Sequence, residues 1–242
     1  MHRFFASDEN FSRDSIFLTG TDASHICTVL RLQTGDKIQV LDGKGSLYIV
    51  KLADVKAKLV KGEIISSEKV NTESPLTIHL GQSLIKGNKF DAVLRKSIEL
   101  GVETITPLMT ERTVVKSDGN KKIARWQKIA EESCKQCGRS SIPKVSGSII
   151  KLDVFCQQGS EADLKLMFWE LESENGLKDI NPEKIPSSVS VLIGPEGGFT
   201  IEEVETARSH GFQTVSLGPR ILRAETAPLV VLSLLQSKWG DI

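Results

Sequence analysis

Two glycine-rich segments near the carboxyl end carry the residue types best suited to binding a ligand. Residues 194–200 read Gly-Pro-Glu-Gly-Gly-Phe-Thr, and residues 217–227 read Leu-Gly-Pro-Arg-Ile-Leu-Arg-Ala-Glu-Thr-Ala. Glycine lets backbone amides and carbonyls approach a ligand closely, and proline restricts the loop. The first segment is neither a P-loop nor a GxGxxG motif. Glu196 and Glu202 would repel phosphate, so the pattern predicts a site for a neutral or cationic ligand and leaves the reaction open.

Each segment comes at the end of a predicted strand. Residues 189–193 form a continuous apolar run that is typical of a buried parallel strand, and residues 215–217 form the next strand. Thr200 with Glu203 forms a capping box, which predicts a helix that Gly211 ends. Because open α/β sheets bind ligands at the carboxyl ends of their strands, both segments are expected at one ligand site.

The sequence pattern changes near residue 72, which predicts two domains, 1–72 and 73–242. In the first, residues 37–41, 46–50 and 59–66 read as strands, Asp42-Gly43 as a tight turn, and residues 25–32 as a short helix. Short strands of this kind predict a small β-barrel. In the second, strands at 76–80, 104–106 and 166–169 alternate with helices from Lys89 and from about 122 to 137, which predicts an α/β domain.

The charges are unevenly distributed although the net charge is zero. Residues 86–151 carry 14 basic and 7 acidic side chains. Such a segment can bind phosphates, but it is equally compatible with a solvated face. Hydrophobic residues make up 39% of the chain, enough for a core. The chain shows neither a membrane-length apolar run nor a secretion signal, so a cytoplasmic location is expected.

The four cysteines and two of the histidines do not predict a site of their own. Cys134 and Cys137 form a CxxC, but no second pair at zinc spacing exists and the two lie on a predicted helix face. We therefore expect no metal and no disulfide. His25 lies far in sequence from the glycine-rich segments, so a structural role or an RNA contact is favoured over catalysis. His79 lies in a strand and is expected in the core.

In order along the chain, the motifs resemble those of the SPOUT methyltransferases, and within them the RsmE family. The two glycine-rich segments carry the resemblance, together with shorter matches at residues 1–5, 25, 29–31, 35–36, 96–102, 107, 110–113, 137–139, 142–143 and 240–241. Each short match is weak, but their common order over nearly the whole chain is specific.

The resemblance implies an S-adenosylmethionine-dependent methyltransferase acting on N3 of a uridine, position 1498, in 16S ribosomal RNA of the small ribosomal subunit. It implies a SPOUT α/β fold with a carboxyl-terminal trefoil knot, an exception to the rule that chains do not knot. It further implies a PUA-like β-barrel that binds RNA, and a homodimer with the cofactor site near its interface.

Catalytic roles follow for two residues of the second segment. Arg223 would stabilise the developing uridine anion, and Glu225 would accept the proton or position the base. The alternative is a structural ion pair between these two side chains.

The cofactor contacts expected are grouped on the two segments and one earlier strand. They are Met167, Trp169, Gly194, Glu196, Gly198, Leu217, Gly218, Ile221 and Leu222. Met167 and Trp169 could pack on the adenine or belong to the strand core. Glu196 could face the positive end of the cofactor or cap its own loop.

The RNA contacts expected are cations, since arginine binds phosphate through paired hydrogen bonds. They are Arg3, Arg31, Lys96, Arg112 and Arg139. For Arg112 the alternative is a surface salt bridge with Glu111. Aromatic residues make up only 5%, so base stacking is not expected to dominate. N3 becomes accessible only when the target base is unpaired or flipped.

Three other functions remain open at this point. The chain could be a SPOUT enzyme that modifies transfer RNA, a non-catalytic RNA-binding assembly factor with a vestigial pocket, or a nucleotide-binding protein. By resemblance, the start of the chain and its barrel argue against an enzyme that modifies transfer RNA. The intact glycines and the pair Arg223 and Glu225 argue against a non-catalytic assembly factor. The missing P-loop lysine argues against a nucleotide-binding protein.

Overall fold

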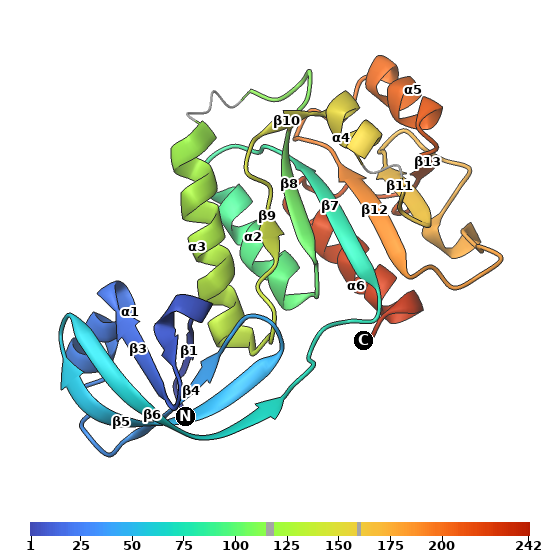
Figure 1. Cartoon of the computed structure of the whole chain (residues 1–242). Coiled ribbons are helices and arrows are strands. Elements are labelled where there is room, and N and C mark those ends of the chain that lie inside the picture. Colours follow the sequence, from blue (N-terminus) through green and yellow to red (C-terminus); the bar gives the residue numbers. More distant parts are fainter. Residues whose placement is uncertain (115–118, 159–160) are drawn as a thin grey trace. The chain divides into compact units, whose positions relative to one another are not determined.

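The computed structural model describes residues 1–114, 119–158 and 161–242 (Figure 1). These divide into two compact units. The smaller unit comprises Met1–Glu73 and Cys134–Ile142, and the larger comprises Ser74–Ser133 and Pro143–Ile242. A single cut near residue 72 therefore misses one segment, since residues 134–142 pack with the amino-terminal strands. None of the helices described is long and apolar enough to cross a membrane.

The smaller unit is built on a six-stranded sheet with the order β1-β4-β5-β6-β3-β2. Its strands are β1 (Arg3–Phe5), β2 (Phe11–Ser12), β3 (Ser15–Thr19), β4 (Lys37–Leu41), β5 (Ser46–Lys56) and β6 (Leu59–Lys69). The predicted hairpin joins β4 to β5, and Oδ1 of Asp42 accepts hydrogen bonds from the backbone N–H groups of Lys44 and Ser46. Side chains such as Phe4, Ile16 and Ile38 fill its core.

The predicted helix over residues 25–32 differs in its bounds and winding. The helical stretch begins earlier, as α1 (Gly20–Ser24), and continues as one wide π turn, η2 (His25–Val29). The Leu30 N–H donates to the His25 carbonyl, the five-residue spacing of a π turn, which hydrophobic periodicity does not reveal. A short 3-10 turn, η1 (Asp8–Asn10), precedes β2.

The larger unit is built on a seven-stranded parallel sheet with the order β10-β8-β7-β12-β11-β13, and β9 also pairs with β8. Its strands are β7 (Thr77–Ser83), β8 (Thr104–Met109), β9 (Lys144–Val145), β10 (Ile150–Lys151), β11 (Leu164–Phe168), β12 (Ser188–Ile193) and β13 (Gln213–Val215). Figure 1 shows β8, β7, β12 and β11 side by side. Because these strands are parallel, the carboxyl ends of β11, β12 and β13 meet at one edge.

Helices occupy the connections between these strands, as the alternating sequence pattern predicts. They are α2 (Lys89–Glu99), α3 (Gly119–Cys137), α4 (Leu152–Gln158), α5 (Ile201–Ser209) and α6 (Ala227–Trp239), with a 3-10 turn at η4 (Leu177–Asp179). Helices α4 and α5 bury Phe155 and Val204 in a core shared with β11 and β12, while α2 packs against α6. The apolar stripe predicted for α2 is buried at Phe90, Leu94 and Ile98.

The last turn of α3 and the loop after it belong to the smaller unit. Cys134 is buried and Cys137 is exposed, the arrangement expected of a helix face. Arg139 is buried beside Glu73, and its Nε donates to Oε2 of Glu73 at 2.7 Å. The other oxygen of Glu73 accepts the backbone N–H groups of Ser140 and Ser141, at 3.0 Å each. One carboxylate thus fixes this loop to the segment that follows β6.

Candidate active site

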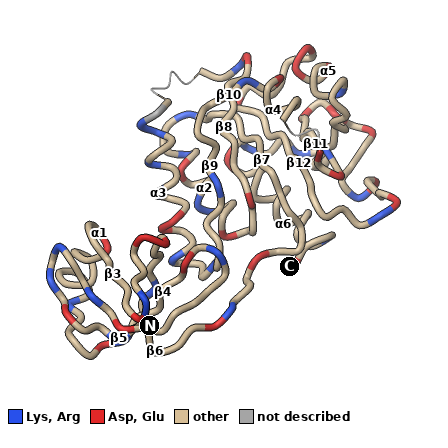
Figure 2. The backbone as a smooth tube through the Cα atoms, in the orientation of Figure 1, with Lys and Arg blue, Asp and Glu red and all other residues tan. Residues whose placement is uncertain are grey.

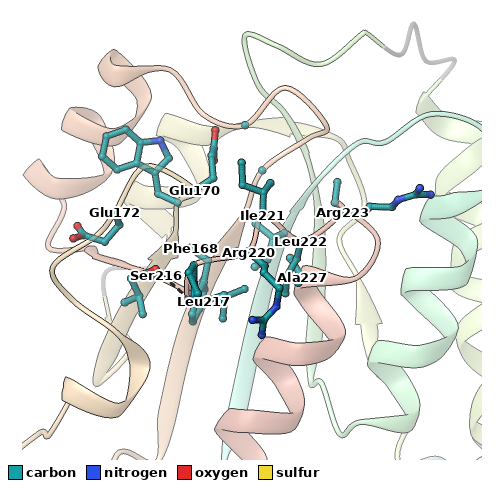
Figure 3. A pocket seen from close by; sticks show the side chains of 18 of the residues that line it. Phe168, Glu170, Glu172, Ser216, Leu217, Arg220, Ile221, Leu222, Arg223 and Ala227 are labelled. Carbon is teal, nitrogen blue, oxygen red and sulfur yellow. Dashed lines mark hydrogen bonds between the residues drawn. The ribbon is translucent and has the colours of Figure 1, made fainter.

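A cavity of about 1040 Å³ lies at the carboxyl ends of β11, β12 and β13 (Figure 3). Three loops line it, drawn from residues 169–179, 194–198 and 216–225, together with Lys89 at the start of α2. Ligand sites of parallel sheets occur at this edge, and sites for small molecules reach this size. The sequence located two of these loops, and the structure adds the one after β11.

The loop between β12 and α5 is fixed at both ends. The N–H of Gly198 donates to the Pro195 carbonyl at 3.0 Å, and Gly198 itself has a φ of +68°. The predicted capping box is confirmed, because Thr200 and Glu203 exchange backbone-to-side-chain hydrogen bonds of 3.2 and 2.9 Å. Nη1 of Arg112 donates to the Gly197 carbonyl at 2.7 Å. These hydrogen bonds therefore hold the backbone of the loop in one conformation.

Glu196 ties this loop to a neighbouring segment. Its Oε1 accepts the backbone N–H of Lys86 at 2.9 Å. Of the two roles left open for Glu196, the structure thus favours the one in which this carboxylate fixes its own loop. The residue also lines the cavity, so contact with a ligand remains a prediction.

The loop after β13 presents an apolar surface to the cavity. The N–H of Ser216 donates to the Asn175 carbonyl at 2.7 Å, and Gly218 follows with a φ of +96°. Ile221 is 81% exposed although it is strongly apolar, and it lines the cavity with Leu217 and Leu222. An exposed apolar group in a concave site indicates a surface that a ligand covers.

Arg223 and Glu225 both line the cavity, but they do not pair with each other. Glu225 instead accepts from Lys89, with 2.9 Å between Oε1 and Nζ. This hydrogen bond is the main cause of a lowered pKa at Glu225, and the charge of Arg223 adds to it. Within the chain as described, the Arg223 guanidinium makes no hydrogen bond or ion pair, and Figure 3 shows it extending away from Glu170 and Glu172. The alternative of a structural Arg223–Glu225 ion pair is therefore wrong.

The expected cofactor residues line the cavity with one exception. The lining includes Trp169, Gly194, Glu196, Gly198, Leu217, Gly218, Ile221 and Leu222. Met167 does not line it and is fully buried in the core with Leu192 and Phe199, so its prediction as a cofactor contact is wrong. Successive residues of a strand point to opposite faces, and it is the next residue, Phe168, that reaches the cavity.

The lining also includes residues that the sequence does not predict, among them Lys89, Phe168, Glu170 and Glu172. The polar residues after β11 carried a usable signal, because they directly follow an apolar strand. Lys89 carried none, since its partner Glu225 lies far away in the sequence.

The expected RNA contacts have different environments. In the smaller unit, Arg3 is exposed, and its Nε donates a hydrogen bond to Gln39. Arg31 is also exposed, and its backbone φ is +54°. Arg139, in contrast, is buried. The buried ion pair with Glu73 gives Arg139 a structural role, so its prediction as an RNA contact is wrong. In the larger unit, Arg112 bonds the glycine-rich loop rather than Glu111, and Lys96 is exposed beside Glu99.

The basic segment forms an exposed band on two helices of the larger unit. Figure 2 shows lysine and arginine along α2 and the first part of α3. Arg95, Lys96 and Lys128 are exposed there, while Arg125 pairs with Asp91. The band is available to a polyanion.

Neither of the two histidines weighed as bases reaches the cavity. His25 lies in the smaller unit, edge-on to Phe4 with ring centroids 6.2 Å apart. His79 lies in β7, and burial lowers its pKa. His79 is half-buried within its sheet, which agrees with a structural role, whereas His25 is exposed, so an RNA contact for His25 stays a prediction.

Comparison with known families decides what kind of protein has this cavity. The model of the RNA methyltransferase domain matches residues 72–236, and that of the RNA methyltransferase PUA domain matches residues 18–65. A ribosomal RNA small subunit methyltransferase E from Buchnera aphidicola is 34% identical over 99% of this chain and 94% of its own length. The chain belongs to this family of RNA methyltransferases. The Bacillus subtilis member is 34% identical over 90% of this chain and 88% of its own.

Two solved structures of relatives have the same fold. A methyltransferase from Legionella pneumophila, solved with the cofactor SAM, is 38% identical over 99% of this chain and 98% of its own, with a TM-score of 0.90. The ribosomal RNA small subunit methyltransferase E of Neisseria gonorrhoeae, bound to S-adenosyl methionine, is 36% identical over 100% and 99%, also with a TM-score of 0.90. The family and the enzyme class expected from the sequence are thus confirmed.

Proposed function

We propose that this protein transfers the methyl group of S-adenosylmethionine to N3 of a uridine in 16S ribosomal RNA, the position numbered 1498. The observation that carries the proposal is the cavity of strand-end loops. In it, an arginine without a side-chain partner among the described residues and a carboxylate of lowered pKa lie next to an apolar, glycine-rich surface. Membership in a family of small-subunit ribosomal RNA methyltransferases supports the substrate. The two relatives solved with this cofactor support its identity.

The residues of the cavity fit S-adenosylmethionine. Phe168, Leu217 and Ile221 offer apolar contacts suited to a flat adenine ring, and the glycines let the backbone come close. The indole Nε1 of Trp169 is buried without a hydrogen-bond partner in the described chain, so a ligand acceptor would satisfy it. Carboxylates such as Glu170 favour a positively charged ligand over a phosphate.

The chemistry divides between the cofactor and the protein. When bound, S-adenosylmethionine supplies a methyl group activated by a positively charged sulfur. The loops hold the reacting atoms in line. Arg223 stabilises the negative charge that develops on the uracil ring, and Glu225 accepts the N3 proton or orients it.

We further propose a knotted catalytic unit, an RNA-binding barrel and a dimeric protein. The carboxyl-terminal loops form a trefoil knot, the smaller unit closes into a PUA-like barrel that binds RNA, and the protein works as a cytoplasmic homodimer. The match of the PUA model to residues 18–65 supports the RNA-binding unit, and the exposed cations on α2 and α3 support binding of a polyanion.

A methyl-transfer assay on small ribosomal subunits tests the proposal. The subunits come from a strain that lacks the gene, and the label is in the methyl group of S-adenosylmethionine. Arg223→Ala and Glu225→Gln should each lower the single-turnover rate by about 100-fold or more while cofactor affinity is kept. Glu205→Gln, an exposed carboxylate paired with Arg208, is the matched control. Near wild-type rates for both variants would refute the roles, and RNA binding without transfer would support a non-catalytic assembly factor.

A further inference from the structure

We infer that Lys89 is a positioning residue for methyl transfer, which holds one oxygen of Glu225 so that the other faces the N–H of the target base. The inference rests on the role proposed for Glu225 and adds a residue from a distant element. Lys89 is the first residue of α2, whereas Glu225 lies in the loop before α6, and both line the cavity.

The two oxygens of Glu225 have different surroundings. Nζ of Lys89 lies 2.9 Å from Oε1. Oε2 is buried, and no hydrogen-bond donor of the described chain satisfies it. A buried carboxylate oxygen without a donor is costly, so such atoms usually have a use. Here a donor brought by the substrate would complete the site, and the N3–H of a uridine is one.

Fold stability does not explain this ion pair. The side chain of Lys89 is 43% exposed, so water screens the pair and its contribution to stability is small. A cation at the first residue of a helix also opposes the helix dipole. The position is thus unfavourable for the helix, but it places the ammonium group where it fixes Glu225.

The step balances with the groups present and the cofactor proposed above. The proton leaves N3 for Oε2 of Glu225, and the N3 electron pair forms the new bond to the methyl carbon. The carbon–sulfur bond breaks, and its electron pair neutralises the sulfur. Lys89 touches neither reacting atom and acts only through Glu225. Of the charged groups described near this carboxylate, Arg223 adds a second positive charge.

A double-mutant cycle with a pH profile tests the inference. Lys89→Met should lower the single-turnover rate by about tenfold, leave the affinity for S-adenosylmethionine unchanged in calorimetry, and move the acid limb of the rate profile to higher pH. The limb moves because the pKa of Glu225 rises when the ammonium group is absent. Lys89→Arg should restore both rate and profile. The double variant Lys89→Met with Glu225→Gln should be no slower than Glu225→Gln alone.

Controls separate this inference from the proposed function. Lys184→Met removes an exposed lysine outside the cavity and should match the wild type. If the rate losses of Lys89→Met and Glu225→Gln multiply in the double variant, or if Lys89→Met keeps the wild-type rate and profile, Lys89 does not act through Glu225. If the wild-type protein itself fails to methylate ribosomal RNA, the proposed function fails first and takes the inference with it.

Discussion

The substitution Gly198→Ala changes the centre of the first glycine-rich loop. Gly198 has a φ of +68°, and a Cβ there would lie 1.8 Å from Oε1 and 2.5 Å from Cδ of Glu170. A residue with a side chain in this backbone conformation costs about 1–2 kcal/mol. For a unit of this size that cost lowers Tm by about 2–8 °C. The carboxylate of Glu170 must also leave its place over the loop.

A comparison with Gly211→Ala separates the loss of stability from the effect on cofactor binding. Gly211 has a φ of +84° at the end of α5, it does not line the cavity, and its nearest neighbour to a Cβ is Nζ of Lys165 at 3.6 Å. Both variants should therefore lose similar stability in calorimetric melting. Only Gly198→Ala should weaken binding of S-adenosylmethionine, by about tenfold, which corresponds to about 1.4 kcal/mol. Equal cofactor affinity in the two variants would refute the assignment of this loop to the cofactor.

Four further predictions concern individual side chains. Arg112→Ala should weaken cofactor binding about threefold to tenfold in the absence of RNA, because the hydrogen bond from Arg112 to the Gly197 carbonyl is lost. If the variant instead weakens only RNA binding, and does so more strongly at low salt, Arg112 has the RNA-binding role. Arg139→Ala should destabilise the smaller unit by about 2–3 kcal/mol in urea unfolding, while Glu73→Gln combined with Arg139→Met should recover part of the loss. Burial raises the pKa of Glu73, but Arg139 and the N–H groups of the loop outweigh burial and lower this pKa below its usual value of 4.5. The stability that Glu73 contributes is therefore present above pH 4.5 and is lost as the pH falls through the lowered pKa. A stability difference between the wild type and Glu73→Gln that does not change with pH would contradict this. The pKa of Cys137 is lowered to about 6, first by its hydrogen bond with Cys134, so the rate at which iodoacetamide alkylates this exposed thiol should reach half its maximum near that pH. A midpoint near 9 in mass spectrometry of the alkylated protein would contradict the lowered value.

Local patterns in the sequence were sufficient for much of the larger unit. The capping box at Thr200 and Glu203 is a contact between near neighbours, and the structure contains it as predicted. Continuous apolar runs predicted β11 and β12, because strands of a parallel sheet are buried on both faces. The ligand edge followed from these strands, since glycine-rich loops came directly after them.

Features that depend on tertiary contacts were missed or wrong. Met167 was expected at the cofactor because a continuous apolar run does not show which face of the strand each residue occupies. Arg139 was expected on RNA because its partner Glu73 lies 66 residues away. The sequence around Lys89 contains nothing to indicate that this residue meets Glu225. Each error concerns the partner of a side chain, which the fold decides and the local sequence does not.

The central claim is tested most directly by nucleoside mass spectrometry of 16S ribosomal RNA from cells with and without this gene. We expect 3-methyluridine to be lost without the gene and to be restored by the wild-type gene, but not by the Arg223→Ala variant. If 3-methyluridine is unchanged when the gene is absent, the protein does not methylate N3 of that uridine, and its cavity serves another RNA.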